Sequence, residues 1–133
     1  MDHFRTTAAL AAVALVGVAC HETPRAEFGK NLYEQYCASC HGTVTEEGFV
    51  STTRAGEAPD LTRLNVRLGR PLPRETLASF IDGRRGLSAH GTREMPVWGT
   101  RLYEDYPQTP GTETVREGTV ALIVDYLETI QVK

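Results

Sequence analysis

The sequence has no internal repeat, no low-complexity segment and no apolar run of the ~20 residues that span a bilayer as a helix. It has few residues that ligate metals through sulfur or nitrogen: three cysteines, two methionines and four histidines. No nucleophile–base pair or pair of catalytic carboxylates stands out, so we do not expect an enzyme. The net charge of −3 argues against a strongly basic protein that binds nucleic acid. At 133 residues, 41% hydrophobic and 23% charged, the composition is that of one soluble globular domain.

What the chain does have is the pentapeptide C-A-S-C-H at residues 37–41. Two cysteines separated by two residues and followed at once by a histidine form the signature of c-type haem attachment. The thiols of Cys37 and Cys40 can each add to one vinyl group of the porphyrin, and His41 is then close enough to ligate the iron. The alternative is a redox pair or half of a zinc site, which would need a second Cys or His pair. No ligand spacing is seen among the remaining candidates, Cys20, His3, His21 and His90.

The N-terminal residues have the pattern of a secretory signal peptide. A short start with one positively charged side chain precedes residues 6–19, a run of 14 small and apolar residues. The following G-V-A-C stretch resembles a bacterial lipobox, in which the cysteine, here Cys20, is lipidated. Gly17 departs from that pattern, which usually has a bulky aliphatic residue there. The alternative is plain cleavage after Ala19, giving a soluble periplasmic protein; either way the protein is exported, as c-type haem attachment requires.

The predicted domain organisation follows from this start. Residues 1–19 form the signal peptide, and residues 20–26 form a polar tether that contains one proline. At ~3.3–3.6 Å per residue, so short a tether would keep a lipid-anchored domain of residues 27–133 close to the membrane surface.

Apolar residues at helical spacing predict a first and a last helix. The first begins near Pro24 or Ala26 and delivers Cys37 at its end. Its inward residues are predicted to be Phe28, Leu32 and Tyr36, with Gly29 and Tyr33 beside them. Gly29 costs about 1 kcal/mol relative to alanine within a helix, so we expect close approach of another helix there; a tolerated surface glycine is the alternative. The last helix starts at a capping box of Thr114 and Glu117, and its apolar stripe consists of Val120, Ile123, Val124, Leu127 and Ile130.

Shorter elements are predicted between these two helices. Residues 42–57 read as a loop, and residues 61–68 as a helix stopped by Gly69 and Pro71. A third helix fits residues 73–82, with Gly83 at its end. Residues 86–100 are expected to be irregular and residues 103–111 to form a loop. The inward residues of the two short helices are predicted to be Leu61, Leu64, Leu68, Leu77, Phe80 and Ile81.

The second axial position of the iron decides between electron transfer and gas binding or catalysis. Once Met1 is removed, Met95 is the only methionine, and it lies between Glu94 and Pro96 in a stretch without helical period. A core methionine usually lies on an apolar stripe, so we predict Met95 as the second ligand. His90 is the alternative ligand. A thioether ligand raises the reduction potential relative to a second imidazole.

With these features assembled, the chain resembles the class I cytochromes c, specifically small bacterial monohaem ones. The resemblance covers roughly residues 28–131 and depends on four stretches: C-A-S-C-H-G from Cys37, A-P-D-L at residues 58–61, M-P-V-W-G from Met95 and D-Y-L at residues 125–127. It implies an all-α fold of about four helices around one covalently bound haem.

The resemblance also implies roles for individual residues. In that family the first and last helices cross near a glycine and an aromatic residue, which would be Gly29 and Tyr126. The carbonyl of a proline after the haem motif accepts a hydrogen bond from the proximal histidine, which would pair Pro59 with His41. We also expect Trp98 to line the haem pocket.

The expected function is that of a periplasmic single-electron carrier with redox-protein partners. The alternatives are an electron-transfer subunit of a periplasmic dehydrogenase or oxidase, and a haem sensor or peroxidase in which Met95 is displaced. Residues 54–101 hold nine arginines against five acidic residues, whereas the segments on both sides are acidic. This suggests steering toward an acidic partner, or pairing of Arg84 or Arg85 with a haem propionate.

Overall fold

A computed structural model describes residues 25–51, 58–84 and 95–132. The predicted signal peptide and Cys20, and with them His90 and Arg85, lie outside the described residues. The elements in chain order are α1 (Arg25–Tyr36), α2 (Ala38–His41), β1 (Thr43–Thr45), β2 (Gly48–Val50), the 3-10 helix η1 (Leu61–Arg63), α3 (Leu64–Leu68), α4 (Arg74–Asp82), α5 (Trp98–Arg101) and α6 (Pro110–Thr129).

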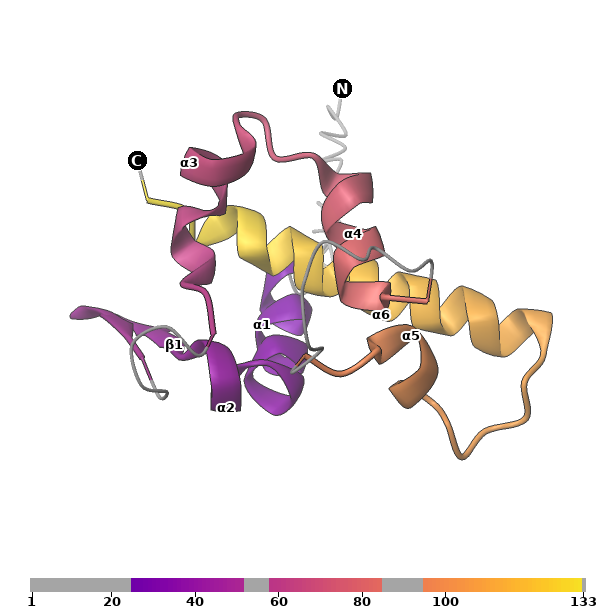
Figure 1. Cartoon of the computed structure of the whole chain (residues 1–133). Helices are drawn as coiled ribbons and strands as arrows, with labels where there is room; N and C mark the ends of the chain where they lie inside the picture. Colours follow the sequence, from indigo (N-terminus) through magenta and orange to yellow (C-terminus); the bar gives the residue numbers. More distant parts are fainter. Residues whose placement is uncertain (1–24, 52–57, 85–94, 133) are drawn as a thin grey trace, which may run out of the picture.

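The described chain is mostly helical, which confirms the predicted fold class. The four helices expected from apolar spacing correspond to α1, α3, α4 and α6. In Figure 1, α6 runs across the whole molecule, α1 crosses its C-terminal half, and α4 lies along its other side. Since α1 starts at Arg25, the predicted tether of residues 20–26 overlaps this helix by two residues. Among the described residues, none of the helices combines the length and apolar character needed to cross a membrane.

At the crossing of α1 and α6 the two backbones approach so closely that only glycine fits. Gly29 is buried, and a Cβ built on it would overlap the backbone carbonyl of Leu122 and touch the side chain of Tyr126. One turn further along α1, the rings of Tyr33 and Tyr126 lie 5.1 Å apart between centroids. The predicted packing role of Gly29 is confirmed, and the alternative of a surface glycine is wrong.

Two predicted inward residues turn out to face solvent. Phe28 is 53% exposed, because the buried face of α1 is centred on Gly29 and Tyr33 rather than on Phe28. Leu68 is 40% exposed, because α3 ends there and only its first turn packs inward. Helical spacing predicted the period in both cases but not which side of the stripe meets the neighbouring helix.

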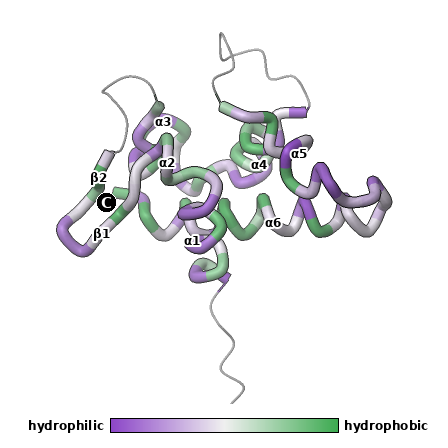
Figure 2. Tube along the Cα trace, turned by 90° about the horizontal axis from the view of Figure 1, so that it is seen from below, coloured by the Kyte–Doolittle hydropathy of each residue, from purple (hydrophilic) through white to green (hydrophobic). Residues whose placement is uncertain are grey.

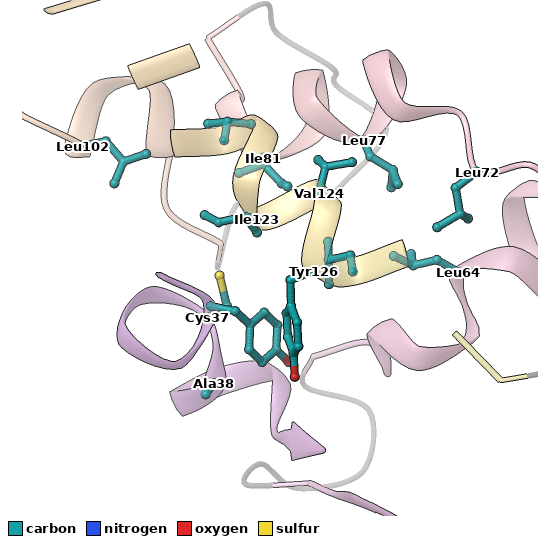
Figure 3. Packing of buried hydrophobic residues seen from close by; sticks show 13 residues of the cluster. Cys37, Ala38, Leu64, Leu72, Leu77, Ile81, Leu102, Ile123, Val124 and Tyr126 are labelled. Atoms are coloured by element: carbon teal, nitrogen blue, oxygen red, sulfur yellow. The ribbon is translucent and has the colours of Figure 1, made fainter. Parts of the chain in front are cut away.

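The buried apolar residues form one cluster between α6 and the elements around it, and Figure 3 shows its packing from close by. The predicted stripe of α6 supplies its centre, while Leu77 and Ile81 of α4 join it from the side. Burying an aliphatic side chain of this size contributes about 1.5–3 kcal/mol. The members of the cluster are Tyr33, Cys37, Ala38, Leu64, Leu72, Leu77, Ile81, Leu102, Val120, Ile123, Val124, Tyr126 and Leu127.

Residues 42–57 are not a loop throughout. β1 and β2 form an antiparallel hairpin in which Thr43 pairs with Val50, Val44 with Phe49 and Thr45 with Gly48. β-branched residues favour the extended backbone of a strand, and Gly48 at the turn has a positive φ of 126°. The prediction of a loop was therefore wrong for residues 43–50.

Two further boundaries differ from the prediction. Residues 98–101 form α5, which includes the last three residues of the stretch expected to be irregular. α6 begins at Pro110, four residues before the predicted capping box, and the side chain of Thr109 accepts a hydrogen bond from the Thr112 amide. Proline suits the first turn of a helix, so the Thr-Pro pair at residues 109–110 is the true start signal. The predicted end of α4 is confirmed, with Gly83 in the left-handed conformation.

Seen from below in Figure 2, the β1–β2 hairpin and α5 lie at opposite sides of the molecule, with α1 and α2 between them. We call the crossing of α1 and α6 together with residues 37–42 the motif end. Residues 95–109, with the parts of α4 and α6 that contact them, form the methionine end.

Candidate haem site

The three functional side chains of the C-A-S-C-H motif lie on a single helical turn. The amide of Cys37 donates to the carbonyl of Tyr33 (2.8 Å), so this turn continues directly from α1. The amides of Cys40 and His41 both donate to the carbonyl of Cys37, at 3.1 and 2.9 Å. Residues three and four apart share one face of a helix, so both thiols and the imidazole are brought together.

His41 is oriented by a hydrogen bond to the backbone of another segment. Its Nδ1 lies 3.0 Å from the carbonyl oxygen of Pro59. A carbonyl can only accept, so Nδ1 carries the proton and donates it. The lone pair is then on Nε2, which has no hydrogen-bond partner within the described part of the chain. His41 is 9% exposed, so it is a nearly buried imidazole with one nitrogen prepared for a ligand.

Two residues outside the predicted site hold this geometry in place. The hydroxyl of Tyr33 donates to the carbonyl of Gly42 (2.8 Å), which ties α1 to the residue after His41. The carboxylate of Asp60 accepts from the amide and the hydroxyl of Thr62, at 2.8 and 2.7 Å, and so caps η1 directly after Pro59. The spacing of Asp60 and Thr62 is the usual signal of a cap and could have been read from the sequence.

Gly42 also allows the hairpin to approach the motif. Its φ is +81°, and a Cβ built on it would overlap the carbonyl of Val50 and contact the ring of Phe49. The β1–β2 hairpin therefore packs directly on the end of the C-A-S-C-H turn.

Met95 is linked to the motif through Trp98. The Trp98 ring lies 5.4 Å from that of Tyr36, the residue before Cys37, and is partly buried against the core. Met95 is 38% exposed and stands three residues before Trp98, at the start of the segment that leads into α5. Trp98 therefore brings the methionine end against the last turn of α1.

The cysteines do not have the properties of a redox pair. Both are free thiols; Cys37 is buried and Cys40 exposed. Burial, followed by the neighbouring Cys40, raises the pKa of the Cys37 thiol to about 12. Dithiol oxidoreductases depend on a lowered thiol pKa, so this alternative is not supported.

The donor set instead suits a c-type haem. Two thiols on one helical turn can hold the porphyrin edge, and the imidazole next to them presents Nε2. Among the described residues, no group of three or more His, Cys, Asp or Glu side chains is arranged to hold a metal ion. Of the two arginines considered for a haem propionate, Arg84 donates hydrogen bonds to Asp82 and Glu113, and Arg85 lies outside the described residues, so this pairing stays a prediction.

Comparison with known proteins agrees with this site. Residues 24–106, more than half of the chain, match the family described as cytochrome C oxidase, cbb3-type, subunit III. The match runs from the start of α1 through the motif and past α5. No curated protein and no solved structure matches the chain. By its family, its helical fold and its donor set, the chain belongs to the cytochrome C oxidase cbb3-type subunit III family and is a class I c-type cytochrome that transfers electrons through haem iron.

Proposed function

We propose that this cytochrome is an exported single-electron carrier with one covalently bound haem, and that it is not itself an enzyme. Cys37 and Cys40 hold the haem, and His41 and Met95 are the axial ligands of its iron. When bound, the haem supplies an iron that accepts and releases one electron. The protein supplies the ligands, a dry surrounding and the surface that meets its redox partners.

The observation that carries this proposal is the hydrogen bond from His41 Nδ1 to the Pro59 carbonyl. It leaves Nε2 as the only nitrogen available to iron, on the same turn as both thiols. Each S–H would add across one vinyl double bond of the porphyrin, so no oxidant is needed and no atom is lost. Cys37 belongs to the buried cluster, which would shield its thioether from water.

Met95 supports electron transfer rather than catalysis in this proposal. A firm thioether ligand leaves no open position on the iron and raises the potential relative to a second imidazole. The contact of Trp98 with Tyr36 supports the assignment, because it holds the methionine segment against the helix that delivers Cys37.

We place the carrier in the periplasm, anchored to the membrane by a lipid on Cys20. The support is the apolar run of residues 6–19 followed by G-V-A-C. Intact mass and detergent partitioning of the matured protein test this placement. The lipid-sized mass and the detergent partitioning should both disappear in the Cys20→Ala variant.

A second function is favoured by the family description, which names a subunit of an oxidase. In this version the chain passes electrons within a periplasmic oxidase or dehydrogenase complex rather than moving between partners. Stable co-purification with a larger redox enzyme from the native membrane would favour it, whereas isolation of the cytochrome alone would favour the carrier.

The test of the main proposal is maturation of the full chain with haem-attachment machinery. We expect haem that resists acid–acetone extraction and a mass increase of one haem. We also expect a near-infrared band from sulfur-to-ferric-iron charge transfer, lost in Met95→Ala and retained in the matched His90→Ala variant. Extractable haem would overturn the covalent attachment, and a bis-histidine magnetic resonance signature would assign His90 in place of Met95. Rapid carbon monoxide binding by the reduced protein would identify a sensor or peroxidase.

A further inference from the structure

We propose that a network of charged and amide side chains at the start of α6 positions the segment carrying Met95, and so determines how firmly the methionine holds the iron. The inference rests on the proposed axial role of Met95. We call Asp82, Arg84, Gln108, Glu113 and Arg116 the anchor network. All of these residues lie outside the haem motif in the sequence, so we treat each as a positioning residue.

Arg116 is the centre of the network. Its side chain is buried, with the whole residue 3% exposed, although it stands on α6 among polar residues. Its Nε donates to the carbonyl of Leu102 (3.1 Å), the residue that ends α5. The two terminal nitrogens donate to Glu113 and to Oε1 of Gln108 (2.7 Å). A buried guanidinium is costly unless it is hydrogen-bonded, and here each of its three nitrogens donates one hydrogen bond, that of Nε to the end of α5.

Gln108 connects the network to the backbone of the residues that precede it. Its amide nitrogen donates to the carbonyls of Tyr103 (3.1 Å) and Tyr106 (2.7 Å). Tyr103 has a positive φ of 61°, which is unusual for a residue other than glycine, and its hydroxyl is 3.0 Å from that of Thr119 on α6. Residues 102–108, most of which belong to the predicted loop of residues 103–111, are therefore attached to α6 by side-chain hydrogen bonds.

Arg84 also packs against α5. Its guanidinium donates to Asp82 (2.7 Å) at the end of α4 and to Glu113 on α6. A Cβ built on Gly99 would overlap both Arg84 and Asp82, so this ion pair lies directly on α5. Arg84 is 37% exposed, and ion pairs of that exposure contribute little to global stability. Its contact with Gly99 is better explained by positioning.

These contacts define the path from the network to the metal. Trp98 fixes the start of α5 against Tyr36, and Arg116 fixes its end at Leu102. Met95 precedes this clamped helix by three residues. If the end at Leu102 is released, α5 can shift, and the thioether leaves the iron for a larger fraction of the time. A ligand that competes for the open iron then binds with a higher apparent affinity.

The experiment is a titration of the matured ferric protein with imidazole. Binding of imidazole is measured as the loss of the sulfur-to-iron charge-transfer band. Arg116→Met removes the donors and keeps a long side chain. We expect it to raise the apparent imidazole affinity about tenfold, equivalent to about 1.4 kcal/mol. Arg74→Met is the matched control, since Arg74 also pairs with two carboxylates, Asp125 and Glu128, but does so away from α5. Its imidazole affinity should stay within twofold of the original.

A second variant keeps the test decisive if Arg116→Met does not fold. Glu113→Gln preserves the shape of the residue that Arg84 and Arg116 share, and should shift the imidazole affinity in the same direction by a smaller factor. Equal imidazole affinities in Glu113→Gln, Arg74→Met and the unaltered protein would overturn the inference while leaving Met95 as ligand. Absence of the sulfur-to-iron band from the unaltered protein would instead overturn the proposed axial ligand, and the inference with it.

Discussion

At the motif end, α1 and α6 meet through backbone and aromatic rings, whereas at the methionine end α4, α5 and α6 meet through charged and amide side chains. The first contact consists of Gly29 against the Leu122 carbonyl and of Tyr33 against Tyr126. The second consists of the anchor network around Glu113 and Arg116. Close-packed interiors have few alternative arrangements, while long polar side chains can exchange partners. The difference suggests that the protein holds His41 rigidly and Met95 adjustably.

The largest expected effect is at the crossing itself. In Gly29→Val, the new side chain collides with the backbone of Leu122, which cannot move without displacing α6. Overpacking a well-packed site costs about 1–3 kcal/mol and more where backbone is involved, so we expect at least about 3 kcal/mol of lost stability by denaturant unfolding. Gly118→Ala is the control, since nothing lies within 4 Å of a Cβ there and alanine favours the helix. Equal losses of stability in the two variants would show that close packing at Gly29 does not stabilise the motif end.

The second prediction concerns an ion-pair cluster near the crossing. Asp125 on α6 accepts hydrogen bonds from Arg25 of α1 and Arg74 of α4. Partial burial alone would raise the pKa of Asp125, but the hydrogen bonds from Arg74 and Arg25 lower it below its ordinary value. Because the folded-state pKa is lowered, this stability is present above about pH 4, the ordinary carboxyl pKa. It is lost as the pH falls through the folded-state pKa.

Asp125→Asn should therefore cost about 1.5–3 kcal/mol at pH 7, the usual contribution of charge-assisted hydrogen bonds. The difference from the unaltered protein should shrink below pH 4. Some acid sensitivity should remain, because the hydrogen bond from Arg84 lowers the pKa of Glu113 as well. Urea unfolding at several pH values measures both effects, and a difference that grows on acidification would contradict the sign.

The two ends also differ in how far the sequence predicted them. The motif end was predicted almost completely, since the C-A-S-C-H spacing, Gly29 and the stripe of α6 each have a local pattern. The methionine end was not: α5 was missed, and the role of residues 103–111 was unknown. Its contacts join Arg116 to Leu102 and Arg84 to Glu113, pairs that are separated by 14 and 29 residues. A local sequence pattern cannot predict contacts between residues so far apart in the chain.

Charge was the least predictable property of all. The arginines between residues 54 and 101 suggested a surface that attracts an acidic partner. In the structure several of them are used internally: Arg67 donates to the Asp60 carbonyl, Arg70 to the Val132 carbonyl, and Arg74 and Arg84 to carboxylates. Composition counts charges but cannot show which of them are paired, so the acidic partner remains a prediction without structural support.

A third prediction tests the hydrogen bond that closes the motif end. Tyr33→Phe removes the hydroxyl that donates to the Gly42 carbonyl and leaves the ring contact with Tyr126 in place. A lost intramolecular hydrogen bond costs about 0.5–1.5 kcal/mol, so we expect about 1 kcal/mol of lost stability, with the sulfur-to-iron band of the haem protein unchanged. Tyr103→Phe is the matched control at the methionine end, because it removes a hydroxyl that pairs with Thr119. There we expect a similar cost in stability, but with weakening of that band.

The smallest expected effect concerns the start of α6, the boundary that was predicted incorrectly from the sequence. Thr109 caps the helix by accepting from the Thr112 amide (3.2 Å), whereas the hydroxyl of Thr114 donates to the Pro110 carbonyl (3.0 Å) within the helix. Loss of a threonine cap costs about 1 kcal/mol, so Thr109→Ala should lower the free energy of unfolding by about that amount. Thr114→Ala should be close to neutral, because alanine favours a helix interior. The opposite order would restore Thr114 as the cap. Since Thr109 also ends the segment that Gln108 holds, Thr109→Ala should loosen the methionine end and leave the motif end as it is.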